Sequence, residues 1–141
     1  MTDPVMILLV EDNPDDESLT VSALRMGTNV TVEVARDGEA ALHFLNQAQE
    51  LPRLVLLDLE LPEMDGLTVL RRIREDDRTS LTPVVILTGF NSSDDVAAGY
   101  RYGANSYIRK PVDFDRFADM IHQLTLYWIV MNEPPPHSPD H

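Results

Sequence analysis

The chain alternates short aliphatic runs with segments in which apolar residues recur at helical spacing. The runs predict β-strands at residues 5–10, 30–35, 54–57 and 84–87, with a weaker one at 106–108. Three of them contain the continuously apolar stretches ILLV, LVLL and VVIL. Strands without polar alternation are typical of a parallel sheet whose two faces are both covered by helices.

The segments between these runs begin with residues that favour helix N-termini. Asn13 and Pro14 precede three acidic residues, which suits an N-cap, a first turn and the positive end of a helix dipole. Further helices are expected from Asp37-Gly38 onward and over about 66–74, 92–102 and 114–131. Strands that alternate with helices indicate parallel pairing through right-handed crossovers.

This pattern predicts an α/β protein with a three-layer (βα)5 flavodoxin-like fold. We expect the parallel strand order 2-1-3-4-5 and an extended last helix. A chain of 141 residues suits one domain, which we place at residues 1–131. The Pro-rich tail, residues 132–141, lacks apolar side chains that could pack, so we expect it to be disordered.

Composition narrows the classes of function. The chain has 24 Asp and Glu against 11 Lys and Arg, a net charge of −13, which argues against the basic face that duplex nucleic acid requires. The N-terminal apolar run is too short to span a membrane and lacks the basic flank of a signal peptide. Without cysteine, disulfides and thiolate chemistry are excluded. We expect a cytoplasmic protein that binds neither nucleic acid nor membranes.

Candidate site residues follow four of the five predicted strands, whereas the second is followed by Arg36-Asp37-Gly38, which indicates a helix start. Glu11 and Asp12 come after the first strand, Asp58 after the third, Thr88 after the fourth and Lys110 just beyond the fifth. In the expected order these strands are neighbours, and ligands of open α/β sheets bind at the carboxyl ends of the strands. Three carboxylates, a hydroxyl and an ammonium are therefore expected to converge on one crevice.

This combination of groups suits a metal-assisted transfer of phosphate. Two carboxylates 4 Å apart repel by about 4 kcal/mol at an effective dielectric constant of 20, and a divalent cation relieves that repulsion. A few carboxylates with room for water suit Mg²⁺. A carboxylate beside Mg²⁺, an ammonium and a hydroxyl can attack phosphorus and form an aspartyl phosphate.

Four motifs resemble the receiver domain of two-component response regulators. They read, in order, ILLVEDNPDD, LLDLELPEMDG, VVILTG and GANSYIRKPVD, and the resemblance covers roughly residues 5–131. It implies a phospho-acceptor rather than an enzyme, with slow self-catalysed loss of the phosphoryl group. The alternative is a Mg²⁺-dependent phosphohydrolase with an aspartyl-phosphate intermediate, although the short connections leave no cap domain over a substrate.

The resemblance also assigns roles to individual residues. It implies that Asp58 accepts the phosphoryl group and that Mg²⁺ is held by Asp58 with Glu11, Asp12 and the backbone carbonyl of Glu60. It further implies that Lys110 pairs with the phosphoryl group and that Thr88 moves to donate a hydrogen bond to it. Tyr107 matches the aromatic switch residue, and Pro111 matches a proline that is preceded by a cis peptide bond.

Two features bear on partners. The NPDDE opening and the long last helix ending near Tyr127-Trp128 resemble stand-alone receivers that serve phytochrome-type histidine kinases. Seven of the eight residues 124–131 are apolar, so the end of this helix needs cover on a second side. We expect a homodimer through the face of the fourth helix, the fifth strand and the fifth helix. A monomer with a more deeply packed helix is the alternative.

Overall fold

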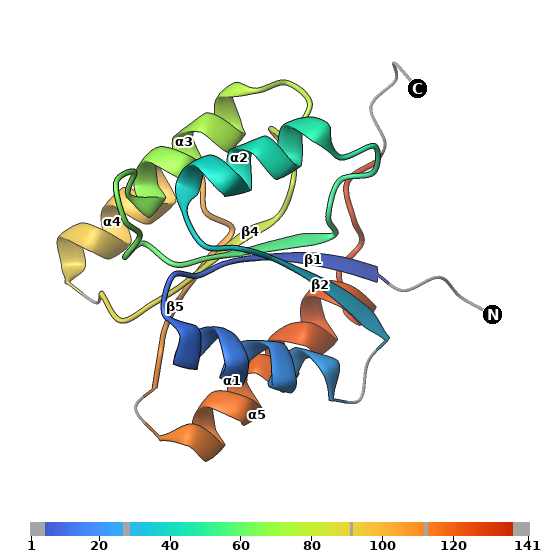
Figure 1. Cartoon of the computed structure of the whole chain (residues 1–141), viewed down its shortest axis with the longest axis vertical. Helices are drawn as coiled ribbons and strands as arrows, with labels where there is room; N and C mark the ends of the chain where they lie inside the picture. The colour runs from blue at the N-terminus through green and yellow to red at the C-terminus, as the bar shows by residue number, and fades with distance from the viewer. Residues whose placement is uncertain (1–4, 27–28, 91, 112, 137–141) are drawn as a thin grey trace.

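The structure is a computed structural model that describes residues 5–26, 29–90, 92–111 and 113–136. Five strands form one parallel sheet in the order β2-β1-β3-β4-β5 (Figure 1). Their bounds are Val5–Val10 for β1, Val30–Ala35 for β2, Leu54–Leu57 for β3, Val84–Thr88 for β4 and Ser106–Arg109 for β5. The predicted fold class and strand order are confirmed, and β4 and β5 each extend one residue beyond the prediction.

Helices cover both faces of this sheet. One layer contains α1 (Pro14–Arg25) and α5 (Phe114–Thr125), and the opposite layer contains α2 (Gly38–Gln47), α3 (Gly66–Glu75) and α4 (Ser93–Arg101) (Figure 1). All five α-helices begin after a side-chain N-cap that accepts hydrogen bonds from the first turn. The capping residues are Asn13, Asp37, Asp65, Ser92 and Asp113.

The central strand β3 shows why the strands are apolar throughout. Leu54 and Leu56 pack into the core under α1 and α5, while Val55 and Leu57 pack into the core under α2 and α3. All four side chains are fully buried. Successive side chains of a strand point to opposite faces, so a sheet covered on both sides needs apolar residues at every position. This rigid sheet fixes the positions of the strand ends.

The last helix changes its winding at Thr125. The expected single helix over 114–131 is an α-helix to Thr125, followed by the π-helical segment η1 (Leu126–Met131). The Thr125 hydroxyl donates to the carbonyl of Ile121 at 2.7 Å, a bond within the helix that favours bending. The wider turn of a π-helix shifts later side chains off the α-helical stripe.

A spacing of three and four residues predicts that one apolar stripe docks this helix on the sheet, made of Phe114, Phe117, Ile121, Leu124, Trp128 and Met131. That prediction is only partly correct. Phe117, Ile121 and Leu124 are buried, and Trp128 is half-buried against the same core. Phe114 and Met131 are exposed instead. They lie at the start of α5 and the end of η1, where the sheet does not cover the helix.

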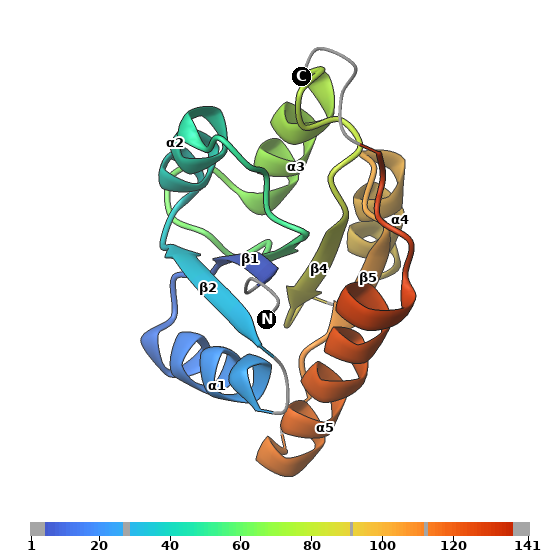
Figure 2. The ribbon, with the colours of Figure 1, turned by 90° about the vertical axis from the view of Figure 1, so that its right-hand side faces the viewer.

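The chain beyond η1 returns along the edge of the sheet. From Asn132 it runs from the layer of α1 and α5 toward the layer of α2, α3 and α4 (Figure 2). Residues 133–136 are neither helix nor strand, and residues 137–141 lie outside the described residues, so disorder of the tail stays a prediction. Among the described residues, no helix is both long enough and apolar enough to cross a membrane.

Candidate functional site

The side chains of Glu11, Asp58 and Lys110 meet at the carboxyl ends of β1, β3 and β5. The ammonium of Lys110 donates to Glu11 Oε1 at 2.6 Å and to Asp58 Oδ2 at 2.8 Å. It also donates to Asp16 Oδ2, in the first turn of α1, at 2.9 Å. The structure thus brings a lysine and three carboxylates together at the predicted edge of the sheet.

Asp58 is the buried centre of this cluster. Its Oδ1 accepts hydrogen bonds from the Thr88 hydroxyl at 2.8 Å and from the backbone N–H of Glu60 at 3.0 Å, while its Oδ2 accepts from Lys110. Only 5% of the Asp58 side chain is exposed. A buried carboxylate is tolerated when it is paired and hydrogen-bonded, and both oxygens of Asp58 meet that condition. Its orientation is fixed by three donors from three different segments.

Burial and hydrogen bonding shift the pKa values of Glu11 and Lys110 in opposite directions. Burial raises the pKa of Glu11 to about 7, although the hydrogen bond from Lys110 opposes that rise. Burial alone would lower the pKa of Lys110, but its three carboxylate hydrogen bonds, that to Asp58 foremost, raise it above the ordinary value. Lys110 therefore stays charged and supplies the positive charge that the buried carboxylates require.

The oxygen atoms of this edge fit a hard cation. Glu11 and Asp58 both point carboxylate oxygens at one position, which the Lys110 ammonium takes. No three Asp, Glu or His side chains form a ready metal cage in the part of the chain that the structure describes. Mg²⁺ keeps several water ligands and needs only one or two carboxylates from the protein, so this donor set suits it.

The other two expected metal ligands lie at the rim. The side chain of Asp12 is exposed, and none of the hydrogen bonds among the described residues links it to the cluster. Glu60 is exposed as well, and its backbone N–H contacts Asp58, while the role of its backbone carbonyl as a ligand stays a prediction. The structure thus brings together Glu11, Asp58, Thr88 and Lys110, with Asp12 adjacent in the chain to the buried Glu11.

Asp16 is a member of the cluster that the sequence reasoning did not single out. The packing of α1 reveals its direction, because the buried residues Thr20, Ala23 and Leu24 mark the face turned toward the sheet. Asp16 lies four residues before Thr20, and the Thr20 hydroxyl bonds its carbonyl at 2.7 Å. Residues four apart share a helix face, so Asp16 faces the sheet edge whereas Asp15 is exposed.

Tyr107 does not contact Asp58 in any hydrogen bond of the described residues, but it contacts the loop that follows Thr88. Its hydroxyl donates to the carbonyl of Phe90 at 2.7 Å, and Phe90 follows Thr88 by two residues. Its ring lies against Gly99 of α4, where a β-carbon would stand 2.9 Å from the ring atom Cδ2. Glycine therefore allows Tyr107 and α4 to approach closely. Tyr107 is thus linked through one short loop to the residue that binds Asp58.

The expected cis bond before Pro111 is wrong. The described backbone contains no cis peptide bond, and the N–H of Lys110 donates to the carbonyl of Thr88 at 2.8 Å. The trans form of a bond before proline is the intrinsically favoured one, by about 0.5–1 kcal/mol.

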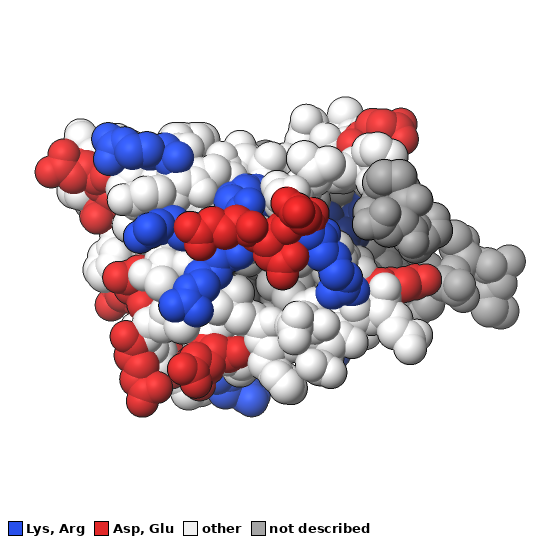
Figure 3. Space-filling model, turned by 90° about the horizontal axis from the view of Figure 1, so that it is seen from above, with Lys and Arg blue, Asp and Glu red and all other residues white. Residues whose placement is uncertain are grey.

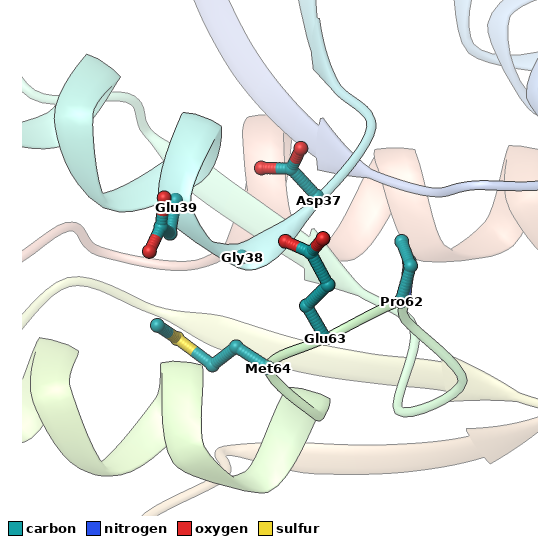
Figure 4. Close-up of a pocket in the computed structure, with 6 residues that line it drawn as sticks. All are labelled: Asp37, Gly38, Glu39, Pro62, Glu63 and Met64. Carbon is teal, nitrogen blue, oxygen red and sulfur yellow. The ribbon is translucent and has the colours of Figure 1, made fainter.

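Two surface hollows flank the strand ends. One, of about 750 Å³, lies beside Lys110 and is lined by Gly89, Arg109, Pro111, Asp113, Arg116 and Met120. The other, of about 220 Å³, lies between the start of α2 and the β3–α3 loop and is lined by Asp37, Gly38, Glu39, Pro62, Glu63 and Met64 (Figure 4). Only the first adjoins the cluster, and it has basic side chains.

Comparisons with known proteins agree with this geometry. The family model described as "Response regulator receiver domain" matches residues 7–122. The chain is 41% identical over 138 residues to the probable methanogenesis regulatory protein FilR2 of Methanothrix harundinacea (strain 6Ac), covering 94% of this chain and 89% of that protein. It is 36% identical over 132 residues to the response regulator Rcp1 of Synechocystis sp. (strain ATCC 27184 / PCC 6803 / Kazusa), covering 89% and 90%.

Solved structures show the same likeness. The phosphorylated cyanobacterial phytochrome response regulator RcpA superimposes with a TM-score of 0.89 at 32% identity, covering 94% of this chain and 99% of that one. The Mn²⁺-bound form of Rcp1 superimposes with a TM-score of 0.87 at 34% identity, covering 94% and 100%. The likeness therefore extends over nearly the whole chain.

Proposed function

The chain belongs to the response regulator receiver family, and from this premise we propose that it is a stand-alone response regulator whose Asp58 accepts a phosphoryl group from a sensor histidine kinase. One observation carries the proposal. The Asp58 carboxylate lies at the end of β3 between a hydroxyl donor, Thr88, and an ammonium, Lys110. Those two groups are suited to receive the oxygens of an incoming phosphoryl group.

The transfer is a displacement at phosphorus. A carboxylate oxygen of Asp58 attacks, the bond from phosphorus to the kinase histidine nitrogen breaks, and that nitrogen leaves with the bonding electron pair. Lys110 offsets the negative charge of the phosphoryl oxygens, and the Thr88 hydroxyl donates a hydrogen bond to one of them. Glu11, Asp12, Asp58 and the Glu60 carbonyl would hold Mg²⁺, which supplies further positive charge to the transferred group.

The new charge changes the surface near Tyr107. An aspartyl phosphate carries about −1.5 to −2 charges where the Asp58 carboxylate carries −1, and it brings three phosphoryl oxygens, so Lys110 and Thr88 gain a stronger partner than the carboxylate they now contact. A shift of Thr88 moves the loop that holds the Tyr107 hydroxyl through Phe90. Tyr107 is the switch residue that transmits the change to the face of α4, β5 and α5.

The partner we favour is a phytochrome-type histidine kinase. Support comes from the solved relatives, among them a cyanobacterial phytochrome response regulator and the bacteriophytochrome response regulator AtBRR, which is 40% identical. The net charge of −13 opposes nucleic-acid binding, and basic and acidic side chains are interspersed on the described face over α2, α3 and α4 (Figure 3). We place the protein in the cytoplasm, where the transmitter domains of sensor kinases lie.

We also propose that the protein is a homodimer through the face of α4, β5 and α5, extended by η1. Exposed apolar side chains occur on three of these elements, α4, α5 and η1: Tyr100, Phe114, Leu126, Tyr127, Val130 and Met131. Tyr127 and Trp128 stack edge to face, with ring centroids 5.1 Å apart. Aromatic side chains of this kind are favoured anchors at interfaces, and a second copy presents the same apolar surface.

A phosphotransfer time course tests the proposed function. A phytochrome-type kinase carrying a labelled phosphohistidine should lose its label to this protein when Mg²⁺ is present, and EDTA should stop the transfer. A parallel assay with p-nitrophenyl phosphate should give no sustained turnover. Repeated turnover of that ester, without uptake of label from the kinase, would establish the phosphohydrolase instead.

A further inference from the structure

The first turn of α1 carries three acidic residues, and each faces a different environment. Asp16 contacts the Lys110 ammonium at 2.9 Å, Glu17 pairs with the exposed Arg36 at 2.9 Å, and Asp15 is exposed. Capping fixes the backbone of this turn, because Asn13 Oδ1 accepts the N–H groups of both Asp15 and Asp16. The position of Asp16 is therefore set by the helix start rather than by a mobile loop.

The ammonium of Lys110 uses three carboxylate partners at once. An ammonium has three N–H donors, and the contacts at 2.6, 2.8 and 2.9 Å to Glu11, Asp58 and Asp16 account for all of them. Two of these partners belong to the chemistry of the site. Glu11 is a proposed ligand of the cation and Asp58 is the proposed acceptor, so both must exchange partners during phosphoryl transfer.

We propose that Asp16 is a positioning residue that anchors the Lys110 ammonium beside Asp58 while Glu11 and Asp58 exchange partners. The inference rests on the proposed function of Asp58. Asp16 is the one partner of Lys110 that neither the cation nor the phosphoryl group requires. Lys110 reaches the cluster on a flexible four-carbon stem, so its head needs a fixed partner to stay in place.

The environment of the pair makes this anchor effective. Only 12% of the Lys110 side chain and 35% of the Asp16 side chain are exposed, whereas the Arg36 side chain of the neighbouring ion pair is 67% exposed. A charge pair at the protein surface is weakened by water, and a partly buried pair is weakened less. Asp16 also stands on a different segment from the other two carboxylates, so the ammonium is held from a separate side of the crevice.

A comparison of Asp16→Ala with Asp15→Ala tests the anchor without metal or phosphate. Both variants remove one carboxylate from the same helical turn, but only Asp16 contacts Lys110. In EDTA, Asp16→Ala should lower the urea midpoint of unfolding more than Asp15→Ala. In a Lys110→Met background, Asp16→Ala should lower the urea midpoint no more than Asp15→Ala does, because no ammonium remains for Asp16 to anchor. If Asp16→Ala lowers the midpoint more than Asp15→Ala by the same amount with and without Lys110, the inference is overturned.

The rate of phosphorylation provides the functional readout. With saturating Mg²⁺ and acetyl phosphate, Asp16→Ala should slow labelling on the order of tenfold because the ammonium is displaced, while Asp15→Ala stays near the parent. Asp16→Glu should recover part of the rate. Equal rates for the two alanine variants would refute the positioning role. A parent that takes up no phosphate would instead refute the proposed function, and the urea comparison would still decide whether Asp16 anchors Lys110.

Discussion

The Thr88 hydroxyl donates a 2.8 Å hydrogen bond to Asp58 Oδ1, which joins the end of β4 to the end of β3. Thr88 is fully buried and Asp58 nearly so. The Thr88 hydroxyl therefore stands beside the proposed acceptor before phosphorylation. A short shift exchanges Asp58 Oδ1 for a phosphoryl oxygen, and that shift moves the loop to Phe90.

We predict that Thr88→Val slows phosphorylation of Asp58 by acetyl phosphate and destabilises the protein. The substitution keeps the shape and removes the donor, and a hydrogen bond to a charged group contributes about 1.5–3 kcal/mol to the free energy of unfolding. Labelling kinetics and urea unfolding measure the two effects.

Thr125→Val is the matched control for that variant. Thr125 is equally buried, but its hydroxyl bonds the neutral carbonyl of Ile121 within α5. Its removal should cost about 1 kcal/mol and leave the labelling rate unchanged. If both valine variants slow labelling equally, the Thr88 hydroxyl has no specific role at the site.

We predict that Lys110→Ala destabilises the protein in EDTA by about 3–5 kcal/mol, the usual cost of removing one partner of a buried ion pair. Glu11 and Asp58 would remain buried without their counter-charge. Mg²⁺ should restore part of the lost stability, because it binds the same carboxylate oxygens. Urea unfolding with and without Mg²⁺ measures both changes.

Arg36→Ala is the control for the lysine variant. It breaks an ion pair of similar length, 2.9 Å, in which a largely exposed arginine donates two hydrogen bonds to Glu17. Exposed pairs of this kind contribute at most about 1 kcal/mol, and the loss should not respond to Mg²⁺. A Lys110→Ala variant as stable as Arg36→Ala would show that the cluster tolerates its negative charge without the ammonium.

The sequence was sufficient for most of the site because the site is built from strand ends. Once the strands were recognised as parallel, Glu11, Asp58, Thr88 and Lys110 had to lie at one edge, and the structure places them there. The same reasoning does not identify Asp16, because Asp16 lies in the first turn of α1 and not at the end of a strand. Its direction depends on how α1 is rotated about its axis, which only the packed structure specifies.

The end of α5 was harder to predict for a related reason. A spacing of three and four residues indicates an α-helix, but it does not reveal the wider winding that begins after Thr125. The change depends on local bonds such as that of the Thr125 hydroxyl and on packing at the sheet edge. Neither the local bond nor the packing is visible in the pattern of apolar residues.

We predict that the double substitution Tyr127→Ala/Val130→Ser yields a monomer, whereas the parent is a dimer at micromolar concentration. Both side chains are exposed on η1, with 49% and 63% of their surface accessible, so their loss should weaken association without harming the fold. Sedimentation velocity measures the change.

The control removes two exposed apolar side chains from elsewhere on the surface. Met26→Ala/Leu81→Ser changes residues that follow α1 and α3 and belong to none of the elements of the proposed face, and it should leave the dimer intact. A parent that sediments as a monomer, with and without acetyl phosphate, would contradict the dimer.

The central claim is that Asp58 alone accepts the phosphoryl group, and intact mass after treatment with acetyl phosphate and Mg²⁺ tests it most directly. The parent and the control Asp94→Asn, an exposed carboxylate in α4, should each gain one phosphoryl group. Asp58→Asn should gain none while its circular dichroism spectrum stays that of the parent, since Lys110 keeps Glu11 and Asp16 as partners. Stoichiometric labelling of a folded Asp58→Asn variant would contradict the account.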